Sequence, residues 1–143
     1  MGVPTMRTFF IFIVLVLPAA AAVNSIVHGT LLRKYAQQTP YFRTEQDISR
    51  FQKVVARQMY AAVAQMGLLM FPLAFYLLGV VTGNLTPRDL PLVIVPAFVI
   101  LVLGYLFKKV EVAVRNIPAT NKEIERKRDA VVTTWKKRAL PDW

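Results

Sequence analysis

Hydrophobic residues in this sequence occur in three long blocks that contain no formal charge. The uncharged stretches cover residues 8–32, 58–87 and 90–107, which are 25, 30 and 18 residues long. An α-helix rises about 1.5 Å per residue and the hydrocarbon core of a bilayer is about 30 Å thick, so a span needs roughly 20 residues. The pattern therefore predicts an all-α integral membrane protein with three transmembrane helices, over about residues 8–32, 58–81 and 90–107.

The first block begins like a secretion signal. Arg7 precedes the apolar run FFIFIVLVL, and the segment PAAAA that follows is typical of a cleavage site near Ala20 or Ala22. However, the uncharged run continues for ten residues beyond Ala22, which makes it long enough to span a bilayer. We therefore expect an uncleaved signal-anchor helix over about residues 8–32, bent at Pro18.

The second block is predicted to belong to a longer helix. Thr44 is suited to cap a helix N-terminus, and Asp47 would lie in the first turn, where a negative charge is favourable. Because the helical pattern continues to Gly83, we predict one helix over about residues 44–81 that extends past the membrane. Apolar residues recur three or four positions apart on one face of its first half: Ile48, Phe51, Val54 and Val55.

The third block is predicted to continue into the charged C-terminal region. Its helix would begin near Pro91, pass Lys108 and end before Pro118. The sequence TNKE at 120–123 has the spacing of a capping box and predicts a basic amphipathic C-terminal helix of about 18 residues, up to Leu140. The apolar residues of that helix form one narrow stripe: Ile124, Val131, Val132 and Trp135.

The net charge of +10 and the pI near 10.3 arise mainly from two segments. Residues 33–57 and the tail 108–143 are strongly basic, whereas the N-terminal flank and the 82–89 hairpin carry little charge. Three spans place the two basic segments on one side of the membrane, and the positive-inside rule makes that side the cytoplasm. We expect a single membrane domain over residues 1–143, in a bacterial inner membrane, with the N-terminus outside and the C-terminus cytoplasmic.

The composition limits the chemistry available to the chain. Hydrophobic residues make up 55% of the 143 residues and the mean hydropathy is +0.43, as in a membrane protein of one domain. There is no cysteine, which excludes disulfides and thiolate metal sites. No carboxylate lies inside a predicted span and no glycine-rich phosphate loop occurs, so we expect no enzymatic activity and no metal site.

His28 is the only histidine and lies in the first predicted span. Asn24 and Ser25 precede it by four and three positions, so the three residues share one helical face. Polar groups in a membrane need partners, and the simpler hypothesis is a hydrogen bond to a neighbouring helix or to interfacial water. The alternative is a cofactor: a neutral imidazole can be the axial ligand of haem iron or of a chlorophyll magnesium.

The same helix has a pattern that favours close helix packing. Small residues recur every four positions at Ala21, Ser25 and Gly29, which lets two helix backbones approach. In the second helix, Gln65 is placed to form a hydrogen bond across to a neighbour. The predicted helix-packing residues are Ala21, Asn24, Ser25, Gly29 and Gln65.

The expected function is that of a non-catalytic accessory or assembly subunit of a larger membrane complex, respiratory, photosynthetic or for transport. Its partners would be other membrane subunits and anionic lipids, and not nucleic acid. A tetrapyrrole-binding subunit that uses His28 is the alternative, and a membrane-surface adaptor for acidic partners or lipids is the second. The predicted lipid or partner contacts lie in the tail: Lys122, Arg126, Arg128, Trp135, Lys136, Lys137 and Arg138.

Overall fold

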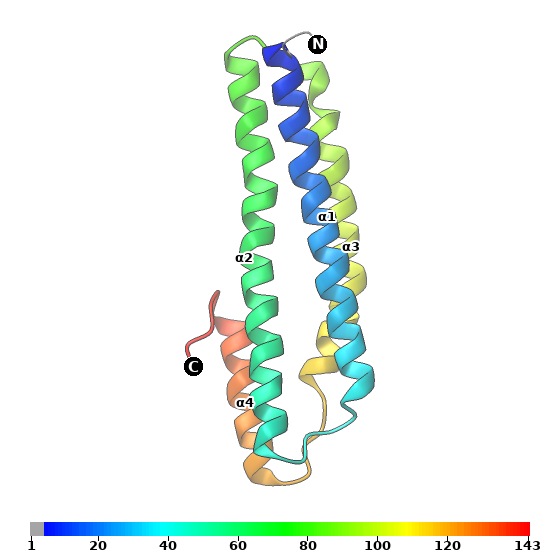
Figure 1. The fold of residues 1–143 in the computed structure, drawn as a ribbon, viewed down its shortest axis with the longest axis vertical. Helices are drawn as coiled ribbons and strands as arrows, with labels where there is room; N and C mark the ends of the chain where they lie inside the picture. Colours follow the sequence, from blue (N-terminus) through cyan, green and yellow to red (C-terminus); the bar gives the residue numbers. More distant parts are fainter. Residues whose placement is uncertain (1–4) are drawn as a thin grey trace. The chain divides into compact units, whose positions relative to one another are not determined.

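The computed structural model describes residues 5–143, which contain four α-helices, a short 3₁₀ turn at Pro87–Asp89 and no β-strand. The four helices are α1 (Met6–Gln38), α2 (Glu45–Val81), α3 (Pro91–Arg115) and α4 (Lys122–Lys137) (Figure 1). Three of them, α1, α2 and the α3 region, are long and apolar enough to cross a membrane, which confirms the predicted number of such helices. The first four residues of the predicted domain 1–143 lie outside the described residues.

The chain divides into two compact units, and the first three helices each contribute to both. The apolar unit consists of the residues up to Ile26 together with Ala64–Tyr105. The basic unit consists of Val27–Val63 together with Leu106–Trp143. Each unit is therefore assembled from segments that are far apart in the sequence, so its packing depends on contacts between different helices.

Charge is divided very unequally between the two units. The basic unit holds 16 of the 18 Lys and Arg residues and seven of the eight acidic residues. The other three charged side chains, in the apolar unit, are Arg7, Arg88 and Asp89.

Helix α1 is longer than the uncharged block from which it was predicted. It runs from Met6 to Gln38 rather than over residues 8–32, and Pro18 lies inside it. The polar residues after Leu32 are good helix formers, so the loss of hydrophobicity there does not end the helix. It ends instead just before Pro40, which cannot donate a backbone hydrogen bond.

Helix α2 begins with the cap that the sequence predicts. The backbone N–H of Asp47 donates to the Thr44 hydroxyl at 3.3 Å. In return, the Asp47 carboxylate accepts the backbone N–H groups of Arg43 at 2.9 Å and of Thr44 at 3.0 Å. These donors favour the ionised form and hold the pKa of Asp47 below its ordinary value. The start of α2 is thereby fixed next to the connector that leads out of α1.

The connection from α2 to α3 depends on two glycines in the apolar unit. Gly83 has a φ of +72°, the left-handed conformation that commonly follows a helix C-terminus. The backbone N–H groups of Asn84 and Leu85 both donate to the Gly79 carbonyl, at 2.8 and 2.9 Å. Leu85 then folds over Gly79 so closely that a Cβ there would lie 2.7 Å from the Leu85 side chain. The turn therefore needs glycine at both positions.

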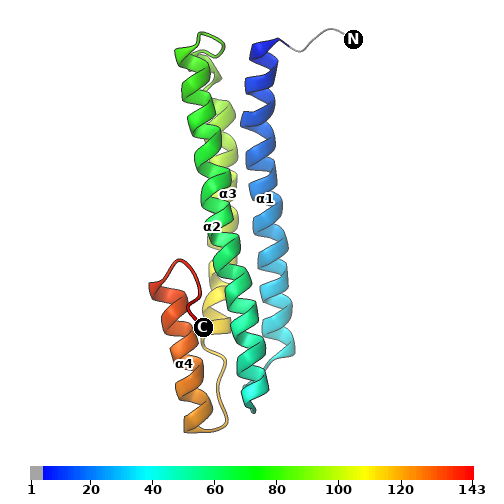
Figure 2. The ribbon, with the colours of Figure 1, turned by 60° about the vertical axis from the view of Figure 1, so that its left-hand side comes forward.

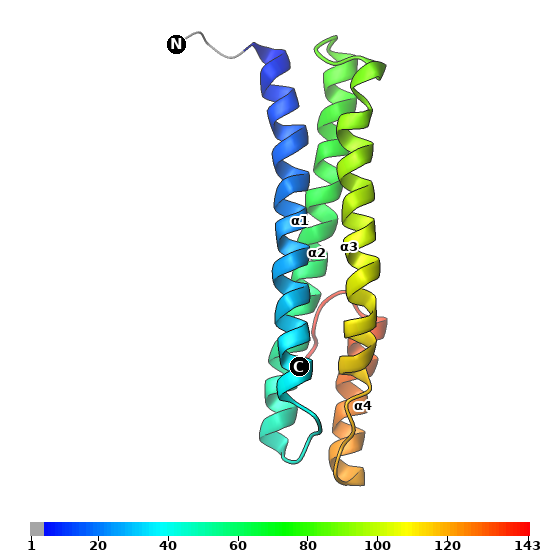
Figure 3. The same cartoon turned by 90° about the vertical axis from the view of Figure 1, so that its right-hand side faces the viewer.

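The core of the apolar unit is small. Arg7 forms an ion pair with Asp89 at 3.4 Å, so the start of α1 and the α2–α3 connection lie at the same end of this unit (Figure 3). The Asp89 carboxylate also accepts the backbone N–H of Thr86 at 2.8 Å, which shapes the 3₁₀ turn. The buried side chains near that end form one cluster: Phe10, Val14, Tyr76, Leu85 and Val93.

The basic unit has a larger core organised around Phe51. This ring is fully buried and contacts three other aromatic rings, with centroid distances of 6.3 Å to Tyr35, 5.0 Å to Phe42 and 6.5 Å to Trp135. All four helices contribute to this core. Its buried members are Leu32, Phe42, Ile48, Phe51, Val55, Met59, Val114, Ile117, Ile124, Val131 and Val132.

Two connectors of the basic unit pair with each other, and this pairing changes the start of α4. Phe42 donates its N–H to the Pro118 carbonyl at 2.9 Å, and its own carbonyl accepts the N–H of Thr120 at 3.0 Å. The Thr120 hydroxyl donates to the same carbonyl at 3.1 Å. The predicted cap at Thr120 is therefore wrong by one residue: the cap is Asn121, whose side chain accepts the N–H of Ile124 at 2.8 Å.

Candidate functional site

A polar contact joins two apolar helices inside the apolar unit. The side-chain amide of Asn24 on α1 donates to the Gln65 side-chain oxygen on α2 at 2.8 Å. The Gln65 nitrogen is buried without a hydrogen-bond partner among the described residues. On the same helix, Ala21 is buried and Ser25 is half-buried. An amide pair in apolar surroundings fixes the rotation of α1 against α2, because turning either helix would break the hydrogen bond between them.

Gly29, the third small residue of the predicted packing pattern, lies in the basic unit. It is buried, and a Cβ added there would collide with the ring of Phe107 on α3. Glycine is therefore required for the close approach of α1 and α3 at this point. The three small residues are regularly spaced but do not belong to one unit: Ala21 and Ser25 lie in the apolar unit, and Gly29 lies in the basic unit.

His28 is half-buried and is held mainly through its backbone. Its carbonyl accepts a hydrogen bond from the Gln58 side chain of α2 at 3.0 Å. The ring nitrogen Nδ1 is buried and has no partner among the described residues. Within that same part of the chain, no group of three or more His, Cys, Asp or Glu residues is placed to hold a metal ion. His28 is thus a single nitrogen ligand at most.

Helix α4 is attached to the first half of α2 within the basic unit (Figure 2). At its start, Lys127 forms ion pairs with Glu45 of α2 and with Glu123 one turn earlier. These carboxylates raise the pKa of Lys127 and keep it charged. Further along, the Trp135 ring contacts Phe51 and lies under the Arg115 guanidinium, 4.7 Å from the ring centroid. The apolar stripe of α4 is therefore used within the chain.

Two of the predicted contact residues in the tail turn toward the chain itself. Arg128 is only 14% exposed and donates to the Ile117 carbonyl at 2.9 Å. Trp135 belongs to the aromatic core described above. The remaining five have exposed side chains: Lys122, Arg126, Lys136, Lys137 and Arg138. The surface that α4 offers to lipid or to a partner is accordingly its basic face.

The contacts of α4 define its direction along α2. Lys127 lies beside Glu45, Trp135 lies beside Phe51, and these pairs advance together along both helices. The two helices are therefore parallel. The basic residues 136–138 follow Trp135 and so lie up to one turn further along α2, in the direction of Arg57. Arg57 is the last charged residue before the uncharged block of α2.

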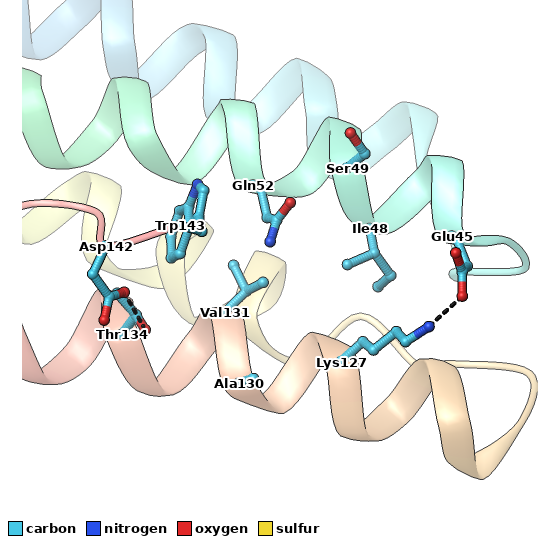
Figure 4. A pocket seen from close by; sticks show the side chains of 10 residues that line it. All are labelled: Glu45, Ile48, Ser49, Gln52, Lys127, Ala130, Val131, Thr134, Asp142 and Trp143. Carbon is cyan, nitrogen blue, oxygen red and sulfur yellow. Dashed lines mark hydrogen bonds and ion pairs between the residues drawn. The ribbon is translucent and has the colours of Figure 1, made fainter.

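A cavity of about 490 Å³ lies between α2 and α4. Figure 4 shows the Lys127–Glu45 pair at one end and Trp143, next to Gln52, at the other. The Thr134 hydroxyl donates to the Asp142 carboxylate at 3.2 Å, which holds the segment after α4 over this groove. The charged side chains of the lining are all paired, Lys127 with Glu45 and Asp142 with Arg138, so none of them is left free to bind a charged ligand.

A second cavity of about 280 Å³ lies where α1 ends and α2 begins. Two arginines, Arg43 and Arg50, line it together with Asp47. The Arg43 guanidinium stacks on the ring of Tyr41, 4.2 Å from its centroid. Sequence reasoning missed this site, because its residues looked like an ordinary connector and a solvated helix face. The clustering of basic residues in 33–57 was the only available signal.

No protein-family model, curated protein or solved structure matches this chain. Its function is therefore inferred from the residues and surfaces described above.

Proposed function

We propose that the chain is an integral membrane protein that acts as a non-catalytic accessory or assembly subunit of a larger membrane complex. In this proposal α1, α2 and α3 cross the bilayer and the basic unit lies on the cytoplasmic side of a bacterial inner membrane. The start of α1 and the α2–α3 connection lie outside. The charge division between the units supports this orientation, because membrane proteins retain Lys and Arg on the cytoplasmic side.

The observation that carries the role as a subunit is the exposed face of α3. Only 11% of the apolar window in this helix region is buried within the chain. Four large side chains at intervals of four, three and four residues form one stripe in the apolar unit and are 55–70% exposed: Ile94, Phe98, Leu101 and Tyr105. A Cβ added at Gly104 beside them would meet no neighbouring atom within 4 Å. This stripe has the spacing of a helix–helix contact and the flat site next to it admits a close neighbour.

Site-specific photo-crosslinking tests the proposal in the intact membrane. A benzophenone amino acid replaces Phe98 on the α3 stripe, and in a matched control it replaces Val23, which is 60% exposed on α1. We expect a discrete protein adduct from position 98 and mainly lipid adducts from position 23. Lipid adducts alone from both positions would contradict a subunit contact through α3.

One observation favours a second function, the binding of a tetrapyrrole. The buried Nδ1 of His28 has no hydrogen-bond partner among the described residues. Coordination of haem iron or chlorophyll magnesium by this nitrogen would give it a bonding partner. We expect the absorbance of the purified chain to decide this: a Soret or near-infrared band that disappears in His28→Ala supports the cofactor, and the absence of any band rejects it.

A further inference from the structure

We propose that the 280 Å³ cavity between the end of α1 and the start of α2 binds the phosphate group of an anionic phospholipid. The lining of the cavity includes two cationic side chains and several hydrogen-bonding ones. Its members are Tyr35, Gln38, Thr39, Pro40, Tyr41, Arg43, Asp47 and Arg50. All of them belong to the basic unit. The site goes beyond the role proposed above, since it requires no protein partner.

The two arginines of the cavity are available to an anion. Neither Arg43 nor Arg50 forms an ion pair with a carboxylate in residues 5–143. Three of the six other arginines of this unit, Arg115, Arg128 and Arg138, are each paired with an acidic side chain. A guanidinium group presents paired N–H donors that match the oxygens of a phosphate. Both unpaired arginines can therefore donate hydrogen bonds to a phosphate that enters the cavity.

The carboxylate in the cavity is already used. Asp47 accepts two backbone N–H groups, from Arg43 and Thr44, as part of the α2 cap. These bonds hold the carboxylate against the connector, and the Arg43 guanidinium stacks on the Tyr41 ring. The cavity therefore keeps a net charge of +1 from two guanidinium groups and one carboxylate, and the Arg43 guanidinium is positioned before the ligand arrives.

The depth of the cavity suits a lipid headgroup. Tyr35 follows Leu32, the last residue of the uncharged block 8–32, by three positions, or about 4.5 Å of helix. Arg50 precedes Arg57 by seven positions, or about 10 Å. The headgroup layer occupies about 5–8 Å on each side of the hydrocarbon core, so the cavity lies at or just beyond the lipid phosphates. The claim that the phosphate belongs to a lipid rests on the proposed membrane orientation. The claim that the cavity binds a phosphate does not.

Lipid retention by the full chain tests the site. The wild type and Arg43→Gln/Arg50→Gln are purified in mild detergent and titrated with phosphatidylglycerol, with phosphatidylcholine and with glycerol 3-phosphate, and bound molecules are counted by native mass spectrometry. Lys108→Gln/Lys109→Gln is the matched control, because it removes the same charge from exposed side chains of the same unit. We expect the arginine pair to weaken phosphatidylglycerol binding about tenfold or more, and the control about twofold or less.

The outcomes separate the phosphate site from its source. Equal losses in the arginine variant and the lysine control would overturn the site, because they would show only a general effect of charge. Displacement of phosphatidylglycerol by glycerol 3-phosphate at similar concentrations would retain the phosphate site and overturn the lipid as its source. If the glutamine variant does not fold, Arg43→Lys/Arg50→Lys keeps the charge but removes the paired donors, and an unchanged affinity there would also overturn the proposal.

Discussion

The two units of this chain share α1, α2 and α3 but expose opposite kinds of surface. The apolar unit has a core cluster of five buried side chains and exposes large apolar residues on all three of its helices. The basic unit has a core cluster of eleven, surrounded by charged residues and covered on one side by α4. One unit therefore resembles a protein in lipid, and the other resembles a protein in water.

This difference shows what stabilises each part. In the proposed membrane arrangement water surrounds the basic unit, so burial of its aromatic and aliphatic side chains can drive folding. In the same arrangement lipid surrounds the apolar unit and removes that driving force, so close packing and the Asn24–Gln65 hydrogen bond have to hold the helices together. Substitutions of the same kind should then have different effects in the two units.

Removal of a large aromatic ring should give the largest difference in stability loss between the two units. Phe51→Ala deletes the fully buried centre of the basic core, and we expect a loss of about 3–5 kcal/mol in the free energy that protects α4 against opening. Phe71→Ala on α2 removes a ring that is 59% exposed in the apolar unit, and we expect a change of about 0.5 kcal/mol or less. Hydrogen exchange of the α4 amides measures both; similar losses from the two variants would refute the contrast.

A single methyl group gives the second comparison. In Gly29→Ala the added Cβ meets the Phe107 ring, and we expect destabilisation by about 1–3 kcal/mol. In Gly104→Ala the added Cβ meets open space, and the better helix propensity of alanine should leave stability equal or slightly higher. Thermal unfolding in detergent, followed by circular dichroism, compares the two. A neutral Gly29→Ala would show that α1 and α3 are not in close contact there.

The cap of α2 should make the basic unit sensitive to acid. Because the folded-state pKa of Asp47 is lowered, its stabilising effect is complete above the ordinary value of 3.8 and is lost as the pH falls through the lower folded-state value. We expect Asp47→Ala to destabilise α2 by about 1 kcal/mol at pH 7 and by less near pH 2. Gln46→Ala in the same turn is the control. Hydrogen exchange at both pH values tests this, and a loss that is the same at both would contradict the assigned cap.

The smallest expected effect belongs to the polar contact of the apolar unit. We expect a coupling energy of about 0.6 kcal/mol between Asn24 and Gln65, from a double-mutant cycle with Asn24→Ala and Gln65→Ala. Thermal unfolding in lipid nanodiscs provides the four stabilities. Strict additivity of the two substitutions would show that the hydrogen bond does not stabilise the folded state.

The helices were predictable because their signals are local. Uncharged runs identified the three long apolar helices, and Thr44 and Gly83 identified the two ends of α2. The extension of α1 to Gln38 was missed because the prediction followed hydrophobicity, while a helix also accepts polar residues. The position of α4 was likewise hidden, because it depends on which distant residues meet it.

The candidate sites were less predictable, because they depend on contacts between residues that are far apart in the sequence. The pairing of Phe42 with Pro118 and Thr120 joins connectors that are more than 70 residues apart, and no local pattern announces it. That pairing places the cap of α4 at Asn121 and joins the two connectors of the basic unit. Arg43 and Arg50 likewise appear in the sequence as two basic residues among many, and only the folded connector brings them to one cavity.

The side of the membrane on which each unit is exposed tests the central proposal most directly. Since the chain has no cysteine, single substitutions Ser49→Cys, Thr133→Cys and Thr82→Cys can be labelled with an impermeant maleimide in sealed inner-membrane vesicles of known orientation. We predict that Ser49→Cys and Thr133→Cys are labelled from the cytoplasmic face and Thr82→Cys only from the opposite face. Labelling of Ser49→Cys and Thr133→Cys from different faces, or of all three from one face, would contradict a chain that crosses the membrane three times.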